Sequence, residues 1–149
     1  LFNPLGDWRV NEAAGAALAR LVPDDAEVLL MADGKAQALL HVVGCAKRLS
    51  TVVARKEYKP YMTGGLSVDL KTITTGNVQQ LHLDGDNIAM LRGANVVIVD
   101  DVVSTGSTIR ALRKLISEVG AKYLCTLAVF TEGPGTHSDV IPLGHLPLF

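Results

Sequence analysis

Residues 96–108 read VVIVDDVVSTGST, and this stretch decides how the rest of the chain is interpreted. Its first four residues are β-branched and apolar, which predicts a buried strand over residues 96–99. Asp100 and Asp101 follow, then two valines, and then a turn rich in hydroxyl groups. The apolar spacing over residues 108–119 predicts a helix directly after that turn. We therefore expect a strand, an acidic pair and a turn that opens a helix.

The turn at residues 104–108 has the composition of an anion-binding site. Gly106 permits a positive φ and a close approach of the backbone, and the first amides of a helix have no partner within the helix. These amides, the helix dipole and nearby hydroxyl groups can cradle a dianion such as phosphate. The hydroxyl groups belong to Ser104, Thr105, Ser107 and Thr108. A plain helix cap has a similar composition, so the turn alone leaves both interpretations open.

The acidic pair favours the binding interpretation. Adjacent carboxylates after a buried strand repel each other, and they are a poor choice for a purely structural role. Beside a sugar, Asp100 and Asp101 can accept hydrogen bonds from neighbouring hydroxyl groups, and they attract a divalent cation. Acids for a diol next to a cradle for a phosphate describe a site for ribose 5-phosphate. The sequence contains neither the P-loop pattern GxxxxGK[ST] nor the dinucleotide pattern GxGxxG.

The composition narrows the class of protein. The chain has 149 residues, of which 48% are hydrophobic and 19% charged, so we expect one compact domain over residues 1–149. The formal net charge of -1 argues against nucleic acid as the main partner, and no apolar run is long enough for a membrane helix. Cys45 and Cys125 lack disulfide or zinc spacing, which fits reduced core residues of a cytoplasmic protein. Since the chain begins with Leu1 rather than Met, we expect some N-terminal residues to be missing.

Strands and helices are expected to alternate along the chain. The predicted strands are 27–31, 50–54, 96–99 and 123–130, and the predicted helices are 7–21, 37–48 and 108–119. This alternation indicates an α/β domain with a mostly parallel central sheet flanked by helices. Ligands of such sheets bind beyond the carboxyl ends of the strands, so the turns after the strands should meet there and form the site. These turns are 32–36, 55–65, 100–108 and 131–137.

Residues 55–80 interrupt the alternation. The segment contains Pro60, three glycines and several threonines, and it has no sustained apolar stripe. This pattern predicts a long loop or a two-stranded arm, and long loops of compact domains often cover a site. Leu81 and Leu83 then alternate with polar residues, as in a half-buried strand.

Residues 96–108 resemble the phosphoribosyl pyrophosphate signature of type I phosphoribosyltransferases, in which four apolar residues, two acids and two apolar residues precede a Thr-Gly phosphate turn. The resemblance covers most of the chain and implies the fold of that family, with a small hood and a flexible catalytic loop at about residues 57–80. It implies that Asp100 and Asp101 hold the ribose hydroxyl groups. The residues expected to bind the 5-phosphate are Val103, Ser104, Thr105, Gly106, Ser107 and Thr108.

A second segment resembles the pyrophosphate loop of the same family. It consists of Asp33, Gly34, Lys35 and Ala36, after the first predicted strand. The family's purine branch often has Glu-Ala-Arg-Gly or Glu-Ala-Lys-Gly there, so in this chain the acid is shorter and the glycine is shifted. Without the other motifs, this segment would be interpreted as an ordinary turn.

A third segment resembles the basic pair that the family directs at pyrophosphate. Arg55 and Lys56 follow a predicted buried strand, and Lys59 is a further candidate. A solvated charge pair is the alternative, but the position after a buried strand favours anion binding. In the catalytic loop that follows, Ser67, Thr74 and Thr75 are the expected polar contacts with the substrate.

The resemblance also implies a reaction. The bond between ribose C1 and pyrophosphate breaks through an oxocarbenium-like sugar, and a base nitrogen attacks from the opposite face. Arg55 and Lys56 would neutralise the departing pyrophosphate together with Mg2+, which the substrate rather than direct protein ligands would mainly hold. Asp101 is a candidate to receive a proton from the incoming base. The expected partners are phosphoribosyl pyrophosphate, a purine base and a second copy of the chain in a homodimer, with no nucleic acid and no membrane.

The acceptor base is indicated only by resemblance. The runs VVARK at 52–56, TTGNVQQLHLD at 74–84 and IPLGHLPLF at 141–149 are most similar to the adenine and xanthine branch, so a purine, adenine-like first, is expected. Two alternatives stay open: an orotate phosphoribosyltransferase, because RKEYK at 55–59 is similar to that branch, and a non-catalytic regulator that senses phosphoribosyl pyrophosphate. The sequence does not identify the base-binding residues. Rings are offered by Phe2, Trp8, His145 and Phe149, each of which fits core packing equally well.

Overall fold

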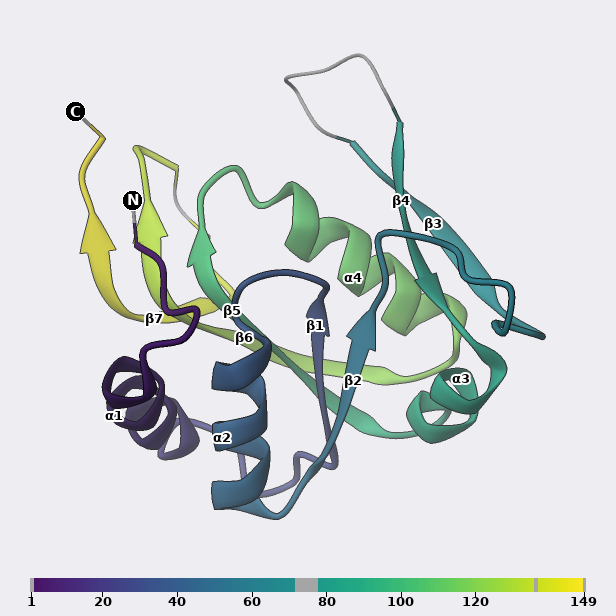
Figure 1. Cartoon of the computed structure of the whole chain (residues 1–149), viewed down its shortest axis with the longest axis horizontal. Coiled ribbons are helices and arrows are strands. Elements are labelled where there is room, and N and C mark those ends of the chain that lie inside the picture. The colour runs from purple at the N-terminus through teal and green to yellow at the C-terminus, as the bar shows by residue number, and fades with distance from the viewer. Residues whose placement is uncertain (1, 72–77, 136, 149) are drawn as a thin grey trace.

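A five-stranded parallel sheet forms the centre of the protein, with the strands in the order β2-β1-β5-β6-β7 (Figure 1). Its strands are β1 (Val28–Ala32), β2 (Ser50–Ala54), β5 (Asn95–Val103), β6 (Lys122–Glu132) and β7 (Val140–Leu146). The helices are α1 (Trp8–Ala19), α2 (Gln37–Lys47), α3 (Gly85–Leu91) and α4 (Ser107–Glu118). The computed structural model describes residues 2–71, 78–135 and 137–148. Within these residues, no helix combines the length and the apolar character that crossing a membrane requires.

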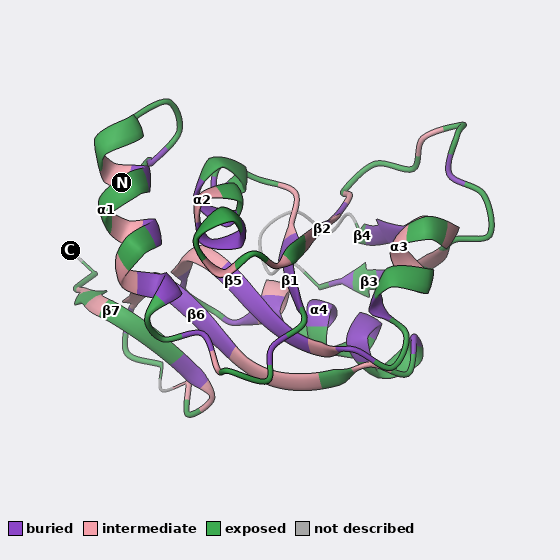
Figure 2. Ribbon diagram, turned by 90° about the horizontal axis from the view of Figure 1, so that it is seen from below, coloured by how far each residue is buried: buried purple, intermediate pink, exposed green. Residues whose placement is uncertain are grey.

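Alternate residues of the central strands pack into two separate cores. In β1, Leu29 and Met31 belong to the core under α1 and α2, whereas Val28 and Leu30 belong to the core under α3, α4 and the strand pair β3 (Leu66–Leu70) and β4 (Gln79–Leu83). Both faces of the sheet are therefore covered, and Figure 2 shows the buried residues concentrated along β5 and β6. A strand that is buried on both faces reads as a continuous apolar run, which is why these strands were predictable. The predicted α/β class with a mostly parallel sheet is confirmed.

Local sequence signals mark the start of α1 and the end of α4. The Asp7 carboxylate accepts hydrogen bonds from the amides of Arg9 and Val10, so it caps α1. Helix α4 buries one apolar stripe and ends just before Gly120, whose φ is 75°.

An antiparallel hairpin confirms the predicted two-stranded arm. It consists of β3 (Leu66–Leu70) and β4 (Gln79–Leu83), and it packs on α4 (Figure 1). A β-bridge joins Arg55 at the end of β2 to His82, with N–H···O distances of 2.9 and 2.7 Å. The Ser67 hydroxyl lies 2.6 Å from His82 Nδ1, so it forms a hydrogen bond between the two strands of the hairpin. Thr74 and Thr75 lie outside the described residues.

Three expectations need correction. Strand β5 continues past Val99 to Val103, because β6 pairs with it beyond Asp100, so the acidic pair lies within the strand and not in a turn. Helix α3 and strand β7 were not predicted, since α3 is short and most residues of β7 are exposed at the sheet edge. Cys45 is exposed on α2 and is not a core residue, whereas Cys125 is partly buried.

Candidate active site

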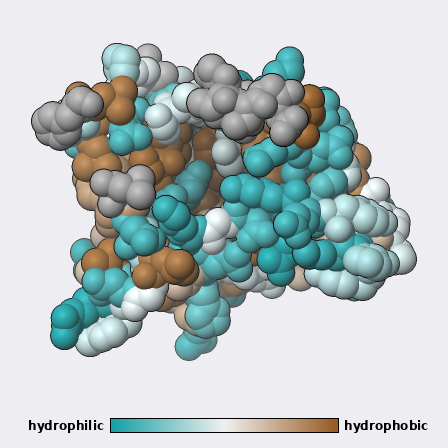
Figure 3. Space-filling view, turned by 45° about the horizontal axis from the view of Figure 1, so that its top comes forward, coloured by the Kyte–Doolittle hydropathy of each residue, from teal (hydrophilic) through white to brown (hydrophobic). Residues whose placement is uncertain are grey.

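A cavity of about 360 Å3 lies at the carboxyl ends of the strands, where the four turns were expected to meet. Each of the four turns contributes to its wall, which confirms the predicted convergence. The predicted site residues that line it are Asp33, Gly34, Lys35, Ala36, Lys56, Asp100, Asp101, Ser104 and Thr108. Figure 3 looks toward this edge of the molecule and shows hydrophilic side chains gathered over its centre. One cavity thus combines basic, acidic and hydroxyl groups.

The acidic pair is fixed by its own backbone. The Asp101 amide donates to Asp100 Oδ1 and the Val102 amide donates to Asp101 Oδ1, both at 2.9 Å. Burial and, after it, the neighbouring Asp101 carboxyl raise the pKa of Asp100 to about 8, against the opposing effects of the Asp101 amide and Lys56. Asp100 therefore tends to hold a proton at neutral pH. Hydroxyl donors or a cation brought beside it would favour its charged form.

The turn between β5 and α4 encloses a smaller cavity of about 130 Å3, lined by Asp100 and residues 102–109. We call residues 104–108 the cradle. Gly106 has a φ of 78°, in the left-handed region that glycine tolerates best. The N-cap residue of α4 is Gly106, which has no side chain, and the Thr105 hydroxyl accepts only a long bond of 3.4 Å from the Ser107 amide. The free helix amides and the surrounding hydroxyl groups suit a phosphate group.

Two side chains that were not predicted from the sequence contact backbone carbonyl oxygens of the cradle and so support it from outside. His137 Nε2 lies 2.8 Å from the carbonyl oxygen of Ser104, and Arg110 Nη1 donates to the carbonyl oxygen of Thr105 at 3.1 Å. A Cβ atom added at Gly106 would lie 3.0 Å from His137 Cε1. His137 belongs to a turn that was expected at this edge, but nothing in the local sequence indicated that its ring reaches the cradle.

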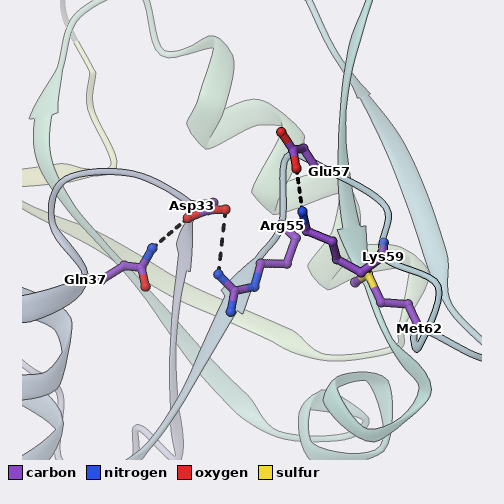
Figure 4. Close-up of polar contacts among 6 residues, drawn as sticks. All are labelled: Asp33, Gln37, Arg55, Glu57, Lys59 and Met62. Atoms are coloured by element: carbon purple, nitrogen blue, oxygen red, sulfur yellow. Dashed lines mark hydrogen bonds and ion pairs between the residues drawn. The ribbon is translucent and has the colours of Figure 1, made fainter.

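The predicted basic residues divide into two groups. Lys35 and Lys56 line the large cavity, whereas Arg55 and Lys59 are not among its lining residues. Arg55 Nη1 lies 3.7 Å from Asp33 Oδ2, and Gln37 Nε2 donates to the other oxygen of Asp33 at 2.6 Å (Figure 4).

Lys59 is held by a neighbouring carboxylate instead. Its Nζ lies 2.6 Å from Glu57 Oε2, and this contact raises the pKa of Lys59 and lowers the pKa of Glu57. Its backbone amide also lies 3.3 Å from Met62 Sδ, as Figure 4 shows. Lys59 therefore points its charge at Glu57 in this arrangement.

The ring candidates for base binding separate clearly. Phe2 lines the cavity and packs edge-on against Phe130, with ring centroids 5.0 Å apart. Trp8 is 67% exposed and does not line the cavity, and His145 Nδ1 lies 3.0 Å from the Thr131 hydroxyl. Phe149 lies outside the described residues.

Glu132 and Leu146 line the cavity beside Phe2 and were not singled out from the sequence. They are partners in the β6–β7 register, so both stand at the same edge of the sheet. The signal for Glu132 was its place at the end of a buried strand, whereas Leu146 depends on the unpredicted β7.

The oxygen donors of the cavity fit Mg2+ only in combination with a ligand. Among the residues that the structure describes, no group of three or more His, Cys, Asp or Glu side chains could hold a metal ion. Mg2+ is usually bound through one or two carboxylates together with substrate phosphates, and it keeps several waters. Asp100 and Asp101 supply such a pair at the cavity wall.

Comparisons with known sequences agree with this geometry. A family model described as phosphoribosyl transferase domain matches residues 28–140. A hypoxanthine/guanine phosphoribosyltransferase of Methanosarcina acetivorans is 27% identical over 132 residues, which are 89% of this chain and 66% of that protein. An adenine phosphoribosyltransferase of Corynebacterium jeikeium is 42% identical over 52 residues, which are 35% of this chain and 25% of that protein. The chain thus spans slightly less than two thirds of the length of the first relative and a quarter of the second.

Comparisons with solved structures identify the same fold. An adenine phosphoribosyltransferase from Thermoanaerobacter pseudethanolicus superposes with a TM-score of 0.79 at 20% identity, covering 94% of this chain and 83% of that one. The Giardia lamblia enzyme, complexed with 9-deazaadenine, gives a TM-score of 0.80 at 13% identity, covering 96% and 83%. The fold that the resemblance implied is confirmed.

Proposed function

The chain belongs to the phosphoribosyltransferase family, and from this premise we propose that it transfers ribose 5-phosphate from phosphoribosyl pyrophosphate to a purine base and releases pyrophosphate. One observation carries the proposal: a pair of carboxylates, a phosphate cradle and two lysines surround adjoining cavities at one edge of the sheet. These are the groups that the two phosphate ends and the diol of this substrate require.

Each part of the substrate has a matching group. The cradle binds the 5-phosphate through helix amides and hydroxyl groups. Asp100 and Asp101 accept hydrogen bonds from the ribose hydroxyl groups, and these bonds favour the charged form of Asp100. Lys35 and Lys56 face the pyrophosphate, and Arg55 reaches it by leaving Asp33, whose ion pair with it is loose at 3.7 Å.

The reaction follows from this placement. As the bond from C1 to pyrophosphate breaks, positive charge develops on the sugar, and the carboxylates below it stabilise that charge. The cationic side chains stabilise the negative charge on the departing pyrophosphate, and Mg2+, when bound, adds further neutralisation of the same group. Positioning of sugar and base supplies the remainder of the rate enhancement. Residues near 57–80 would form a loop that closes over the site and excludes water. In this proposal Asp101 receives the proton that the base loses.

The base is proposed to be a purine, with adenine first. The sequence relatives and solved structures named above are purine enzymes, and both adenine and hypoxanthine/guanine activities occur among them. Glu132 favours adenine over hypoxanthine, because a carboxylate beside Phe2 and Leu146 can accept a hydrogen bond from an exocyclic amino group, which guanine also carries. We also propose that the protein is a cytoplasmic homodimer; sedimentation velocity tests its oligomeric state.

The deciding experiment measures pyrophosphate release. The protein is mixed with Mg2+, phosphoribosyl pyrophosphate and one base at a time: adenine, guanine, hypoxanthine, xanthine or orotate. Release with adenine is expected, and release with another purine would change only the base assignment. The variant Glu132→Gln should lower kcat/KM for adenine more than for hypoxanthine, which has no amino group.

A regulator that senses phosphoribosyl pyrophosphate is the competing function. It predicts tight binding of phosphoribosyl pyrophosphate, measured by calorimetry, without pyrophosphate release for any of the five bases. That pair of results would refute the enzyme. Release with orotate alone would instead establish the orotate enzyme.

A further inference from the structure

A third cavity lies between α4 and the hairpin, outside the site described above. Its volume is about 500 Å3, and we call it the α4 groove. Its lining consists of Asp69, Lys71, Ser107, Arg110, Ala111 and Lys114. Ser107 belongs to the cradle and Arg110 contacts it, Asp69 and Lys71 belong to the segment proposed as a closing loop, and Ala111 and Lys114 have no role in the proposed reaction.

The α4 groove carries positive charge that the protein itself neutralises only in part. Lys71 has no ion-pair partner within 4.0 Å in the described part of the chain. Lys114 is 3.9 Å from Glu118 in an exposed pair, which is a weak contact. Arg110 donates one bond to the cradle, although a guanidinium has five N–H donors. The Asp69 carboxylate accepts a hydrogen bond from Gln80 at 3.0 Å, so three cations face a single occupied carboxylate.

The α4 groove adjoins the cradle through one shared residue. Ser107 lines both cavities, at the first turn of α4. Arg110 and Lys114 follow at three and seven residues, so they lie on the same face of the helix as Ser107. At a rise of 1.5 Å per residue this face extends roughly 10 Å from the cradle. A phosphate in the cradle therefore has a row of cations leading away from it.

We propose that the α4 groove binds the additional phosphate groups of nucleoside 5′-diphosphates and triphosphates whose first phosphate occupies the cradle. The inference rests on the proposed function, because it takes the cradle as the 5-phosphate site. Phosphoribosyl pyrophosphate and a nucleoside monophosphate carry a single phosphate at that position and leave the groove unused. Longer nucleotides gain charge-assisted hydrogen bonds there, so they compete with phosphoribosyl pyrophosphate and inhibit the enzyme.

The test compares nucleotides that differ only in the length of the phosphate chain. Affinities for AMP and ADP, and for GMP and GDP, are measured by calorimetry in magnesium-free buffer. The diphosphate should bind about tenfold more tightly, as one charge-assisted hydrogen bond provides. In Lys114→Gln this preference should fall to about threefold or less, with the AMP affinity and the rate of pyrophosphate release unchanged. Lys71→Gln should lower the preference in the same direction.

Lys122→Gln is the matched control, because Lys122 is exposed at the opposite end of the sheet and its loss removes the same charge. Equal affinity for mono- and diphosphates in the wild type, or a preference that survives in the double variant of Lys71 and Lys114, would overturn the inference. Free tripolyphosphate that binds as tightly as ATP would overturn the assignment to nucleotides. A protein that releases pyrophosphate but shows no such preference refutes the groove alone, whereas absence of phosphoribosyl pyrophosphate binding refutes the proposed function.

Discussion

We have proposed two anion sites: the cradle, and the part of the cavity wall that carries Lys35 and Lys56, called the pyrophosphate side. The chain builds these two sites differently. The cradle comes from five consecutive residues, and it uses backbone amides around Gly106. The pyrophosphate side comes from side chains on two separate turns, with Lys35 after β1 and Lys56 after β2. Its remaining contacts are exposed, such as the 3.7 Å pair of Arg55 and Asp33. A site made of backbone is specified locally and held rigidly, whereas a site made of exposed side chains depends on distant elements and adapts to its ligand.

The largest effect should come from the acidic pair that adjoins the cradle. Asp100→Asn together with Asp101→Asn should weaken phosphoribosyl pyrophosphate binding by more than about 100-fold, because two charge-assisted hydrogen bonds to the diol are lost. Calorimetry measures the affinity, and circular dichroism checks that the double variant is folded. Retained affinity in a folded variant would show that the diol binds elsewhere.

The same pair predicts a pH dependence of stability. The pKa of Asp100 is about 8 in the folded protein and 3.8 ordinarily, so the folded state binds the proton more tightly. The contribution of this carboxyl is complete below about pH 4, declines as the pH rises and is lost above about pH 8. Asp100→Asn should therefore gain on the order of 4 kcal/mol relative to the wild type between pH 5 and pH 8.5. Urea unfolding of both proteins at the two pH values measures this difference. If the free energies of unfolding of the two proteins change by the same amount between the two pH values, the prediction is refuted.

The contrast also explains how much could be predicted from the sequence. The cradle was predictable because strand, acids, glycine and helix are consecutive and each obeys a local rule. The reach of β5 to Val103 was not, since the strand is extended by pairing with Phe130 and Thr131, which lie almost thirty residues away in the chain. Strand β7 shows the same limit, because its sequence has an interior proline and exposed apolar residues, and only contact with β6 makes it a strand.

Within the site, the sequence did not predict the contacts that depend on how the loops fold. Lys56 could be placed because it lies two residues after the end of β2. The outward pairing of Lys59 with Glu57, and the contact of His137 with the cradle, depend on how loops fold back. Glu132 lay in a turn that was expected at the correct edge, but the sequence does not reveal which side chain of a turn faces the cavity.

Replacing Gly106 tests whether backbone geometry makes the cradle. In Gly106→Ala a side chain is forced into the left-handed region and against His137, so stability should fall by about 1–2 kcal/mol and KM for phosphoribosyl pyrophosphate should rise about tenfold. Gly93→Ala is the matched control, since Gly93 has a similar φ of 74° with nothing within 4 Å of the added Cβ. It should lose similar stability and keep its KM. A Gly106→Ala enzyme with normal KM would contradict a cradle made of backbone.

His137 tests whether the cradle needs an outside brace. His137→Ala removes the contact with Ser104, which is worth about 1 kcal/mol, so KM for phosphoribosyl pyrophosphate should rise about fivefold with little change in kcat. His137→Asn can still donate to that carbonyl oxygen and should recover part of the loss. His41→Ala, at an exposed position on α2, serves as the control. An equal fall in kcat and unchanged KM would place His137 in the chemistry instead of the brace.

The smallest effect is expected on the pyrophosphate side. A double-mutant cycle of Asp33→Asn and Arg55→Gln, followed by urea unfolding, should give a coupling below about 1 kcal/mol, because both side chains are partly exposed and 3.7 Å apart. Lys114 and Glu118, an exposed pair at 3.9 Å on α4, provide a reference cycle of the same kind. A coupling of 2 kcal/mol or more for Asp33 and Arg55 would mean that this side is as rigid as the cradle. Arg55 would then be held away from pyrophosphate, and its proposed movement toward the ligand would be wrong.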